Sequence, residues 1–284
     1  MIVANRDKGR EFMAFRAIMK RPSRRVAVIA FAAAVAAPGI ASAQDGDGRD
    51  RVITVGLGAQ VGPEHLGSDG YSVFPLPFGK IRRPGEPMPY SASDDSPGIR
   101  LIRGENFSIG PTFNFRAKRR ESDVGAAVGD IKVGLEPGIF VEAYASPAIR
   151  LRGEARIGIN GHDGLVGDLA VDYILRSADQ KLVMGVGPRA RFGDGEFEGR
   201  YFGVAPDVAL RTGLVAYAPD GGLYAVGLQA SGHYQLTDRW GIYGEAGYDR
   251  LVGAGDKSPI VRNFGSENQF YVGVAATYTF DLRL

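Results

Sequence analysis

Along most of the chain, apolar and polar residues alternate with a period of two. The final segment shows this most clearly, because one of its faces carries Phe270, Val272, Val274, Ala276, Tyr278, Phe280, Leu282 and Leu284. Successive side chains of a β-strand point to opposite faces, so this alternation predicts a sheet between two different environments. The apolar face continues to the last residue, which favours a strand that faces lipid over one exposed to water.

The same alternation predicts strands throughout the chain. The expected strands are 51–61, 72–82, 98–104, 106–118, 131–143, 149–160, 165–175, 182–192, 224–236, 240–250 and 270–284, with a less regular one at 200–211. Most are about ten residues long, near the length of a tilted membrane-spanning strand. We count ten to fourteen strands and favour twelve, because closed bacterial barrels have an even number.

The connections between these segments are of two kinds. Short turns rich in Gly, Asp and Ser indicate antiparallel neighbours, and they are predicted at 161–164, 177–179, 219–222 and 237–238. Longer polar stretches are predicted to be loops, and they lie at 83–97, 118–130, 193–200 and 253–268. We expect Asp94, Asp95 and the run 118–121 to be solvated.

The fold class that this pattern predicts is all-β, a closed antiparallel transmembrane barrel over 44–284. Aromatic residues near the segment ends favour it, since barrels carry aromatic girdles at both membrane interfaces. We place on the apolar, lipid-facing side Tyr173, Tyr224, Tyr234, Trp240, Tyr248, Phe270, Tyr278 and Phe280. The alternatives are a soluble β-sandwich, or a soluble lipid-binding barrel with its apolar face inside.

The polar faces carry charges of both signs, which a barrel would turn toward its lumen. The predicted lumen network consists of Lys132, Glu136, Glu142, Arg150, Arg152, Glu154, Arg156, Asp168, Asp172, Arg189, Arg191, Glu245 and Asp249. Opposite charges on neighbouring strands can pair and cross-link the interior. The alternative is a narrow polar channel, which we disfavour because the two signs are interspersed.

The first 43 residues resemble a secretory signal peptide. A basic region ends at Arg25, an apolar run covers 26–37, and Ala41 and Ala43 form a small-residue cleavage site after which the mature chain would begin. The basic region is long enough that Met13 or Met19 is an alternative start. Removal of this segment takes eight basic and two acidic residues and leaves a formal net charge of −4. We therefore expect no nucleic-acid partner.

Candidate chemistry is sparse. The chain has no cysteine, which excludes disulfides and thiol chemistry. Its three histidines, His65, His162 and His233, lack the spacing of a metal site, and we expect no metal and no cofactor. A lipid hydrolase built on His162 or His233 is the less favoured alternative, since neither has a neighbouring nucleophile in an activating arrangement.

Several short motifs, in order, resemble the MipA/OmpV family of outer-membrane proteins. They are Val55-Gly56-Leu57-Gly58-Ala59, Pro63-Glu64, Gly67-Ser68, Gly134-Leu135-Glu136-Pro137-Gly138, Gly161-His162-Asp163-Gly164, Tyr201-Phe202-Gly203-Val204, Gly221-Gly222-Leu223, Arg250-Leu251, Asp256-Lys257-Ser258-Pro259-Ile260-Val261 and Tyr278-Thr279-Phe280. The order and spacing of these motifs carry the resemblance. The chain departs from the family pattern at its end, because it continues past Phe280 to Leu284 instead of closing on an aromatic residue.

The resemblance implies a non-enzymatic outer-membrane protein without catalytic residues. It implies a scaffold that links a murein transglycosylase to a murein synthase, with outer-membrane lipid and the barrel assembly machinery as further partners. The alternatives are a narrow polar pore, or an adhesin or stress-response protein of the outer membrane.

Overall fold

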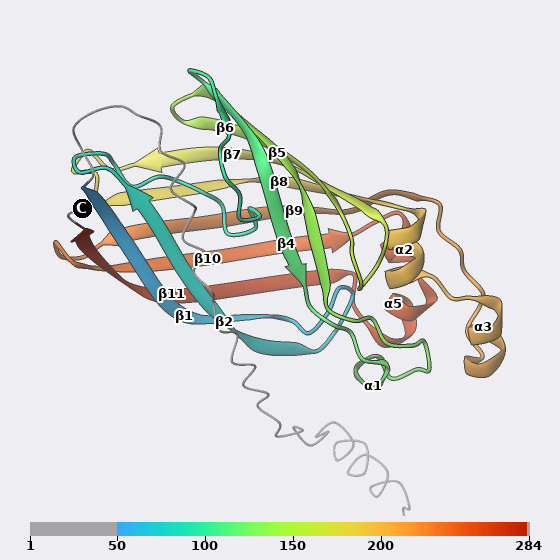
Figure 1. The fold of residues 1–284 in the computed structure, drawn as a ribbon. Helices are drawn as coiled ribbons and strands as arrows, with labels where there is room; N and C mark the ends of the chain where they lie inside the picture. Colours follow the sequence, from blue (N-terminus) through green and yellow to red (C-terminus); the bar gives the residue numbers. More distant parts are fainter. Residues whose placement is uncertain (1–49, 283–284) are drawn as a thin grey trace, which may run out of the picture. The chain divides into compact units, whose positions relative to one another are not determined.

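Eleven strands form one antiparallel sheet in the computed structural model, which describes residues 50–282 (Figure 1). The strands are β1 (Arg51–Pro63), β2 (Tyr71–Arg82), β3 (Ile102–Arg103), β4 (Phe107–Arg116), β5 (Gly134–Ser146), β6 (Ile149–Ile157), β7 (Leu165–Arg176), β8 (Leu182–Asp194), β9 (Gly221–Gln235), β10 (Trp240–Leu251) and β11 (Asn268–Leu282). The all-β antiparallel prediction is confirmed. The proposed signal peptide and its cleavage residues Ala41 and Ala43 lie outside the described residues.

The strands follow one another around the sheet in the order β2-β1-β11-β10-β9-β8-β7-β6-β5-β4-β3. Pairing of the first and last strands, with Arg51 opposite Leu282, brings the two ends of the described chain together. Every neighbouring pair is antiparallel. Strand direction therefore alternates along the order, and the two outermost strands, β2 and β3, run the same way.

This shared direction fixes the path of the chain between β2 and β3. A connection between two strands that run the same way must return along their length. Residues 83–96, which we call the inner strap, make this return on the charged side of the sheet, where Met88, Tyr90 and Ala92 are buried. Residues 97–101 then run beside β4, with the Ile99 amide donating to the Pro111 carbonyl at 3.0 Å. The sequence predicted a loop at 83–97 but did not predict that this segment runs through the interior.

No strand pairing joins β2 to β3 within the described residues. Strand β2 carries Pro75 and Pro77, opposite Ala59 and Leu57 of β1. Proline has no N–H to give to a neighbouring strand, so prolines belong on sheet edges. Two of them in β2 therefore favour its position at an edge. Full closure of the sheet between β2 and β3 stays a prediction.

Within residues 50–282, five short helices gather at the end of the sheet opposite Arg51 and Leu282 (Figure 1). They are α1 (Glu121–Val124), α2 (Gly195–Phe202), α3 (Pro206–Thr212), α4 (Ala254–Lys257) and α5 (Pro259–Phe264). Helix α2 packs most deeply, because Phe197 and Phe202 are fully buried beside Tyr224 and Leu251. We call this end the capped end and the other, where the strands are joined by short turns, the terminus end.

The strand predicted at 200–211 is wrong, because this stretch contributes to α2 and α3. The Asp194 carboxylate accepts a hydrogen bond from the Phe197 amide and so caps α2, while Pro206 occupies the first turn of α3. Loss of this strand changes the favoured count of twelve to eleven. The polar stretch 253–268, predicted as a loop, contains α4 and α5.

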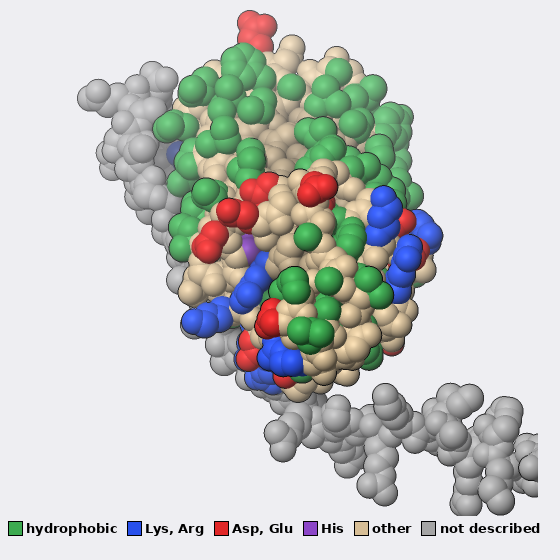
Figure 2. Space-filling model, turned by 90° about the vertical axis from the view of Figure 1, so that its right-hand side faces the viewer, with side chains coloured by type: hydrophobic (Ala, Val, Ile, Leu, Met, Phe, Trp, Pro, Cys, Tyr) green, Lys and Arg blue, Asp and Glu red, His purple; other side chains and the backbone are tan. Residues whose placement is uncertain are grey.

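The outward face of the sheet is apolar, as the alternation predicts. Leu169, Val272 and Val274 are each more than half exposed, and many similar side chains surround them. Figure 2 looks onto the capped end, with hydrophobic side chains along the wall of the sheet and charged ones around the cap. Among the described residues, no helix is long and apolar enough to cross a membrane.

Tyr224, assigned to the outward face, lies inside, and so does Ile131, the first apolar residue of the predicted strand 131–143. Tyr224 is buried, because the register between β8 and β9 shifts at Phe192 and adds one residue to β9. Such a bulge breaks the strict alternation of faces. Ile131 is buried because it precedes β5 and pairs instead with Arg119.

Candidate functional site: the filled interior

The centre of the interior is organised around Arg150 of β6, whose side chain is fully buried. Its guanidinium contacts Glu142 of β5 at 2.7 Å, Asp172 of β7 at 2.7 Å and Asp95 of the inner strap at 2.5 Å. Arg150 and Asp172 are direct cross-strand neighbours, and Glu142 faces Arg152 in the same way. A buried charge is tolerated only when it is paired and hydrogen-bonded, a condition that three carboxylates fulfil here.

A second cluster joins the inner strap to β8. Arg189 contacts Asp94 at 2.9 Å and Asp172 at 2.7 Å. Arg191 contacts Asp94 at 3.0 Å, and it also reaches two wall carboxylates, those of Asp168 and Asp249. The expectation that Asp94 and Asp95 are solvated is therefore wrong, because the strap carries both carboxylates into the arginine-rich interior.

A third cluster lies toward the capped end around Glu136 of β5. Its carboxylate contacts Arg156 at 3.2 Å, Arg116 of β4 at 2.5 Å and the Nε2 atom of His162 at 2.8 Å. Arg156 also pairs with Glu154 and with Asp168. This cluster links the charged interior to the aromatic cap, since the guanidinium of Arg116 lies 5.0 Å from the centre of the Phe197 ring.

Two members of the predicted network lie apart from these clusters. Lys132 precedes β5, is exposed, and forms no ion pair with any described residue. Glu245 of β10 is buried but accepts a hydrogen bond from the Tyr243 hydroxyl at 3.1 Å instead of pairing with a base. The other eleven lie inward and in contact, and Arg152 joins Glu154 at 2.7 Å.

The interior also contains residues that the sequence analysis did not assign to it. Arg100 pairs with Glu142 at 2.9 Å, and the Ser96 amide donates to Glu154. Arg119, expected to be solvated, is buried at the capped end and donates to the Tyr201 carbonyl oxygen at 2.9 Å. Arg116, which pairs with Glu136, was also not assigned to the interior. Of these residues, it alone could have been predicted there, because it falls on the polar side of the predicted strand 106–118.

The histidines occupy sites without a hydrolytic arrangement. His162 is buried between Glu136 and the rings of Phe197 and Tyr201. The Nε2 atom of His233 lies 2.9 Å from the Thr277 hydroxyl. In residues 50–282, neither histidine is hydrogen-bonded to a serine, and no group of three or more His, Cys, Asp or Glu is arranged to hold a metal ion.

The cap contains one acidic group in an unusual setting. Glu198 of α2 is buried, and its Oε1 atom has no hydrogen-bond partner among the described residues. Burial raises the pKa of this carboxyl to about 6, helped by the charges of Asp194 and Asp220.

An antiparallel meander with an apolar outer face, a charged and filled interior, short turns at one end and longer connections at the other has the organisation of a transmembrane β-barrel protein. The model of the family described as MltA-interacting protein MipA matches residues 55–280. The chain belongs to this family, and the resemblance drawn from its motifs is confirmed. No curated protein sequence matches the chain.

The chain has a distant similarity to several solved structures of outer-membrane proteins. An outer-membrane channel from Pseudomonas putida F1 has 10% identity and a TM-score of 0.39, covering 84% of this chain and 97% of its own. The outer-membrane channel DcaP of Acinetobacter baumannii has 10% identity and a TM-score of 0.36, with 82% and 97% covered. The KdgM porin has 9% identity and a TM-score of 0.35, with 81% and 99% covered. These likenesses are distant.

Proposed function

We propose that this protein is a plugged outer-membrane barrel that acts as a non-enzymatic scaffold for cell-wall enzymes. The mature chain would start after Ala43, insert with its apolar face in lipid, and recruit a murein transglycosylase together with a murein synthase. Family membership supports a transglycosylase as the partner, because the family is described by its interaction with MltA. The assembly machinery for outer-membrane barrels would insert it.

The observation that favours a scaffold over a pore is the filling of the interior. The inner strap crosses the space that a channel would need, and its Asp94 and Asp95 pair with Arg189, Arg191 and Arg150. The ring of Tyr90, also in the strap, lies against Arg150 on one side and packs onto Gly185 of β8 on the other. A passive pore requires a continuous aqueous path, and this interior is occupied by paired side chains.

The ends of the barrel suggest where partners bind. Outer-membrane barrels have short turns in the periplasm and longer connections outside. Murein enzymes would therefore meet the terminus end, at the turns 147–148, 177–181 and 236–239, whereas the helical cap would face outward.

A binding experiment tests the scaffold directly. The purified mature protein in micelles is immobilised, and binding of a purified murein transglycosylase is measured by surface plasmon resonance. We expect saturable binding that the double variant Asp238→Ser/Arg239→Ser, in the β9–β10 turn, weakens at least tenfold. A matched cap variant, Leu210→Ser on α3, should bind as the wild type does.

Absence of saturable binding by the wild-type protein would contradict the scaffold. Loss of binding in Leu210→Ser, with normal binding in the turn variant, would reverse the proposed orientation.

A further inference from the structure

The charges of the interior are balanced in its middle but not at its terminus end. Each central arginine contacts at least one carboxylate within 4 Å, as Arg150 and Arg189 illustrate. Toward the terminus end, β2 turns Lys80 and Arg82 inward, and neither forms an ion pair with any described residue. Uncompensated cations in a partly buried setting favour an anion as the missing partner.

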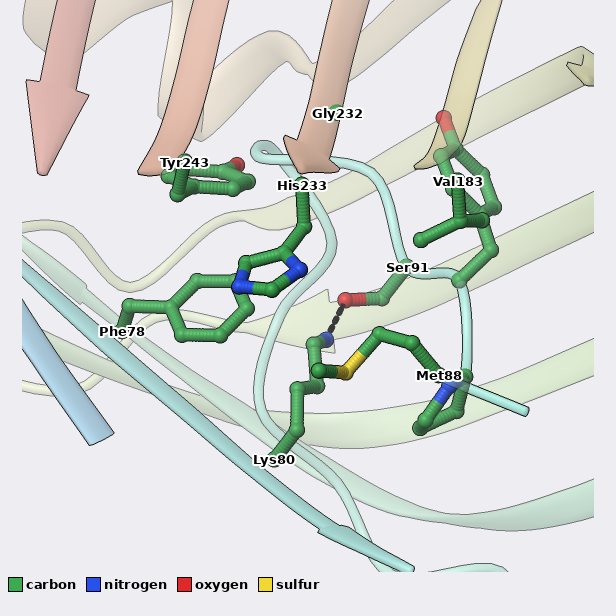
Figure 3. Close-up of a pocket in the computed structure, with 10 residues that line it drawn as sticks. Phe78, Lys80, Met88, Ser91, Val183, Gly232, His233 and Tyr243 are labelled. Carbon is green, nitrogen blue, oxygen red and sulfur yellow. Dashed lines mark hydrogen bonds between the residues drawn. The ribbon is translucent and has the colours of Figure 1, made fainter. Parts of the chain in front are cut away.

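Lys80 lies against a small, partly open cavity (Figure 3). Its ammonium group donates to the Ser91 hydroxyl of the inner strap and lies 5.7 Å from the centre of the Phe78 ring. The cavity measures about 10 Å³ and is also lined by His233 and Tyr243. That volume suits one water-sized atom, such as a single oxygen of a larger group.

His233 presents a ring nitrogen that has no hydrogen-bond partner among the described residues. His233 is 3% exposed and stacks on Phe78 with 5.3 Å between ring centres. Its Nε2 contacts the Thr277 hydroxyl, while its buried Nδ1 contacts no hydrogen-bonding group of the described residues. A tautomer in which Nε2 accepts from Thr277 leaves Nδ1–H available to donate.

Arg82 completes the arrangement. Its Nη1 donates to the Glu86 carbonyl oxygen at 2.7 Å, which holds the guanidinium at the start of the strap, while its buried Nε has no hydrogen-bond partner in residues 50–282. Lys80 and Arg82 share the inward face of β2 two residues apart, a separation of about 7 Å along the strand. Buried hydrogen-bond donors are nearly always satisfied in folded proteins. The unpartnered Nδ1 of His233 and Nε of Arg82, together with the ammonium group of Lys80, therefore indicate a ligand.

We propose that the terminus end of the interior binds one oxyanion group, a phosphate or a carboxylate. One oxygen enters the cavity beside Lys80 and His233, and the remaining oxygens extend along β2 toward Arg82. A free anion and the headgroup of an anionic phospholipid are two sources of this chemistry. The site does not depend on the scaffold function, because it uses only inward residues and the strap.

Isothermal titration calorimetry tests this site with two probes. Full-length mature protein in non-ionic micelles is titrated with inorganic phosphate, and the same protein is titrated in micelles with a short-chain phosphatidylglycerol, with phosphatidylcholine as the uncharged reference. We expect one saturable site per chain for at least one probe. Phosphate binding identifies a free anion, and binding of phosphatidylglycerol alone identifies a headgroup.

Two variants locate the site, and a third serves as a control. Lys80→Met and Arg82→Gln should each weaken binding at least tenfold, while Arg211→Gln, exposed on α3 at the capped end, should leave it unchanged. Migration of unboiled protein on a gel verifies folding, and Arg82→Gln decides the outcome if Lys80→Met does not fold. Absence of a saturable signal with both probes, or unchanged affinity in the folded variants, would overturn the proposal.

Discussion

Individual residues show how the charges of the interior are paired with one another. Arg150 is fully buried because Glu142, Asp172 and Asp95 surround its guanidinium. Arginine suits this position, since its planar fork offers five donors in fixed directions. The same geometry explains why charges of both signs alternate on the polar faces in the sequence.

Replacement of Arg150 by an uncharged residue should lower the stability of the folded protein. Arg150→Met leaves three buried carboxylates without their common partner, and we expect a loss of about 3–5 kcal/mol in the free energy of unfolding. The temperature at which unboiled protein converts to the unfolded gel band measures the change. Arg211→Met on α3, where the pair with Asp207 is exposed, should shift that temperature little. Equal shifts for both variants would contradict the role of Arg150.

Glu198 makes the cap sensitive to pH. Its pKa rises from an ordinary 4.5 to about 6 in the folded protein, so the unfolded chain releases this proton first. Stability of the cap is therefore highest below pH 4.5 and falls as the pH rises to about 6, by about 2 kcal/mol.

Glu198→Gln should remove this dependence. We expect the amides of α2 to exchange more slowly at pH 8 in the variant than in the wild type, after correction for intrinsic rates, and equally at pH 4. Faster exchange of the variant at pH 8 would show that the ionised carboxylate stabilises the cap.

Among the elements, the strands were predictable from the sequence and the cap was not. Alternation located eleven of the twelve expected segments, including the short 98–104 region that holds β3, because each strand faces two different environments. Helix α2 was missed although Phe197 and Tyr201 stand four residues apart, a helical spacing. Gly195, Gly199 and Gly203 surround these aromatic residues and resemble a loop.

The inner strap could not be predicted for a different reason. Its polar residues have the composition of a surface loop, and nothing local distinguishes Asp94 and Asp95 from solvated acids. The arginine partners of Asp94 are 95 and 97 residues away in sequence, and Arg150, the partner of Asp95, is 55 residues away. Similarly, the bulge that turns Tyr224 inward depends on the register of β9 against β8, which local alternation does not encode.

Weakening the strap should open the interior. In Asp94→Asn/Asp95→Asn the amides lose the charge that binds Arg150, Arg189 and Arg191, so the strap should leave the lumen part of the time. Planar-bilayer recordings should show a silent wild type and intermittent conductance in the double variant. Asp207→Asn, an exposed substitution on α3, should remain silent. Steady conductance by the wild type would contradict a plugged barrel and support the pore.

The sheet of the whole molecule has an odd number of strands, eleven within residues 50–282. An even count was expected from barrels that close, yet eleven strands leave β2 and β3 running the same way, with the strap returning between them. The odd number follows from one segment becoming helical and from the internal return. The sequence patterns predicted which side of each strand is apolar, whereas the chain path between β2 and β3 required the structure.

The proposed membrane insertion requires that the apolar outward face contacts lipid while the charged side chains lie in the interior. Because the chain has no cysteine, single cysteines can be placed freely. Leu169→Cys and Val274→Cys, on the outward face, carry a nitroxide label in reconstituted bilayers, with Leu210→Cys on the cap as a water-exposed reference.

Electron paramagnetic resonance then compares relaxation by oxygen, which concentrates in lipid, with relaxation by a water-soluble nickel complex. We predict that oxygen dominates at positions 169 and 274 and that the nickel complex dominates at position 210. Dominance of the nickel complex at positions 169 and 274 would place the apolar face outside the bilayer and contradict the account.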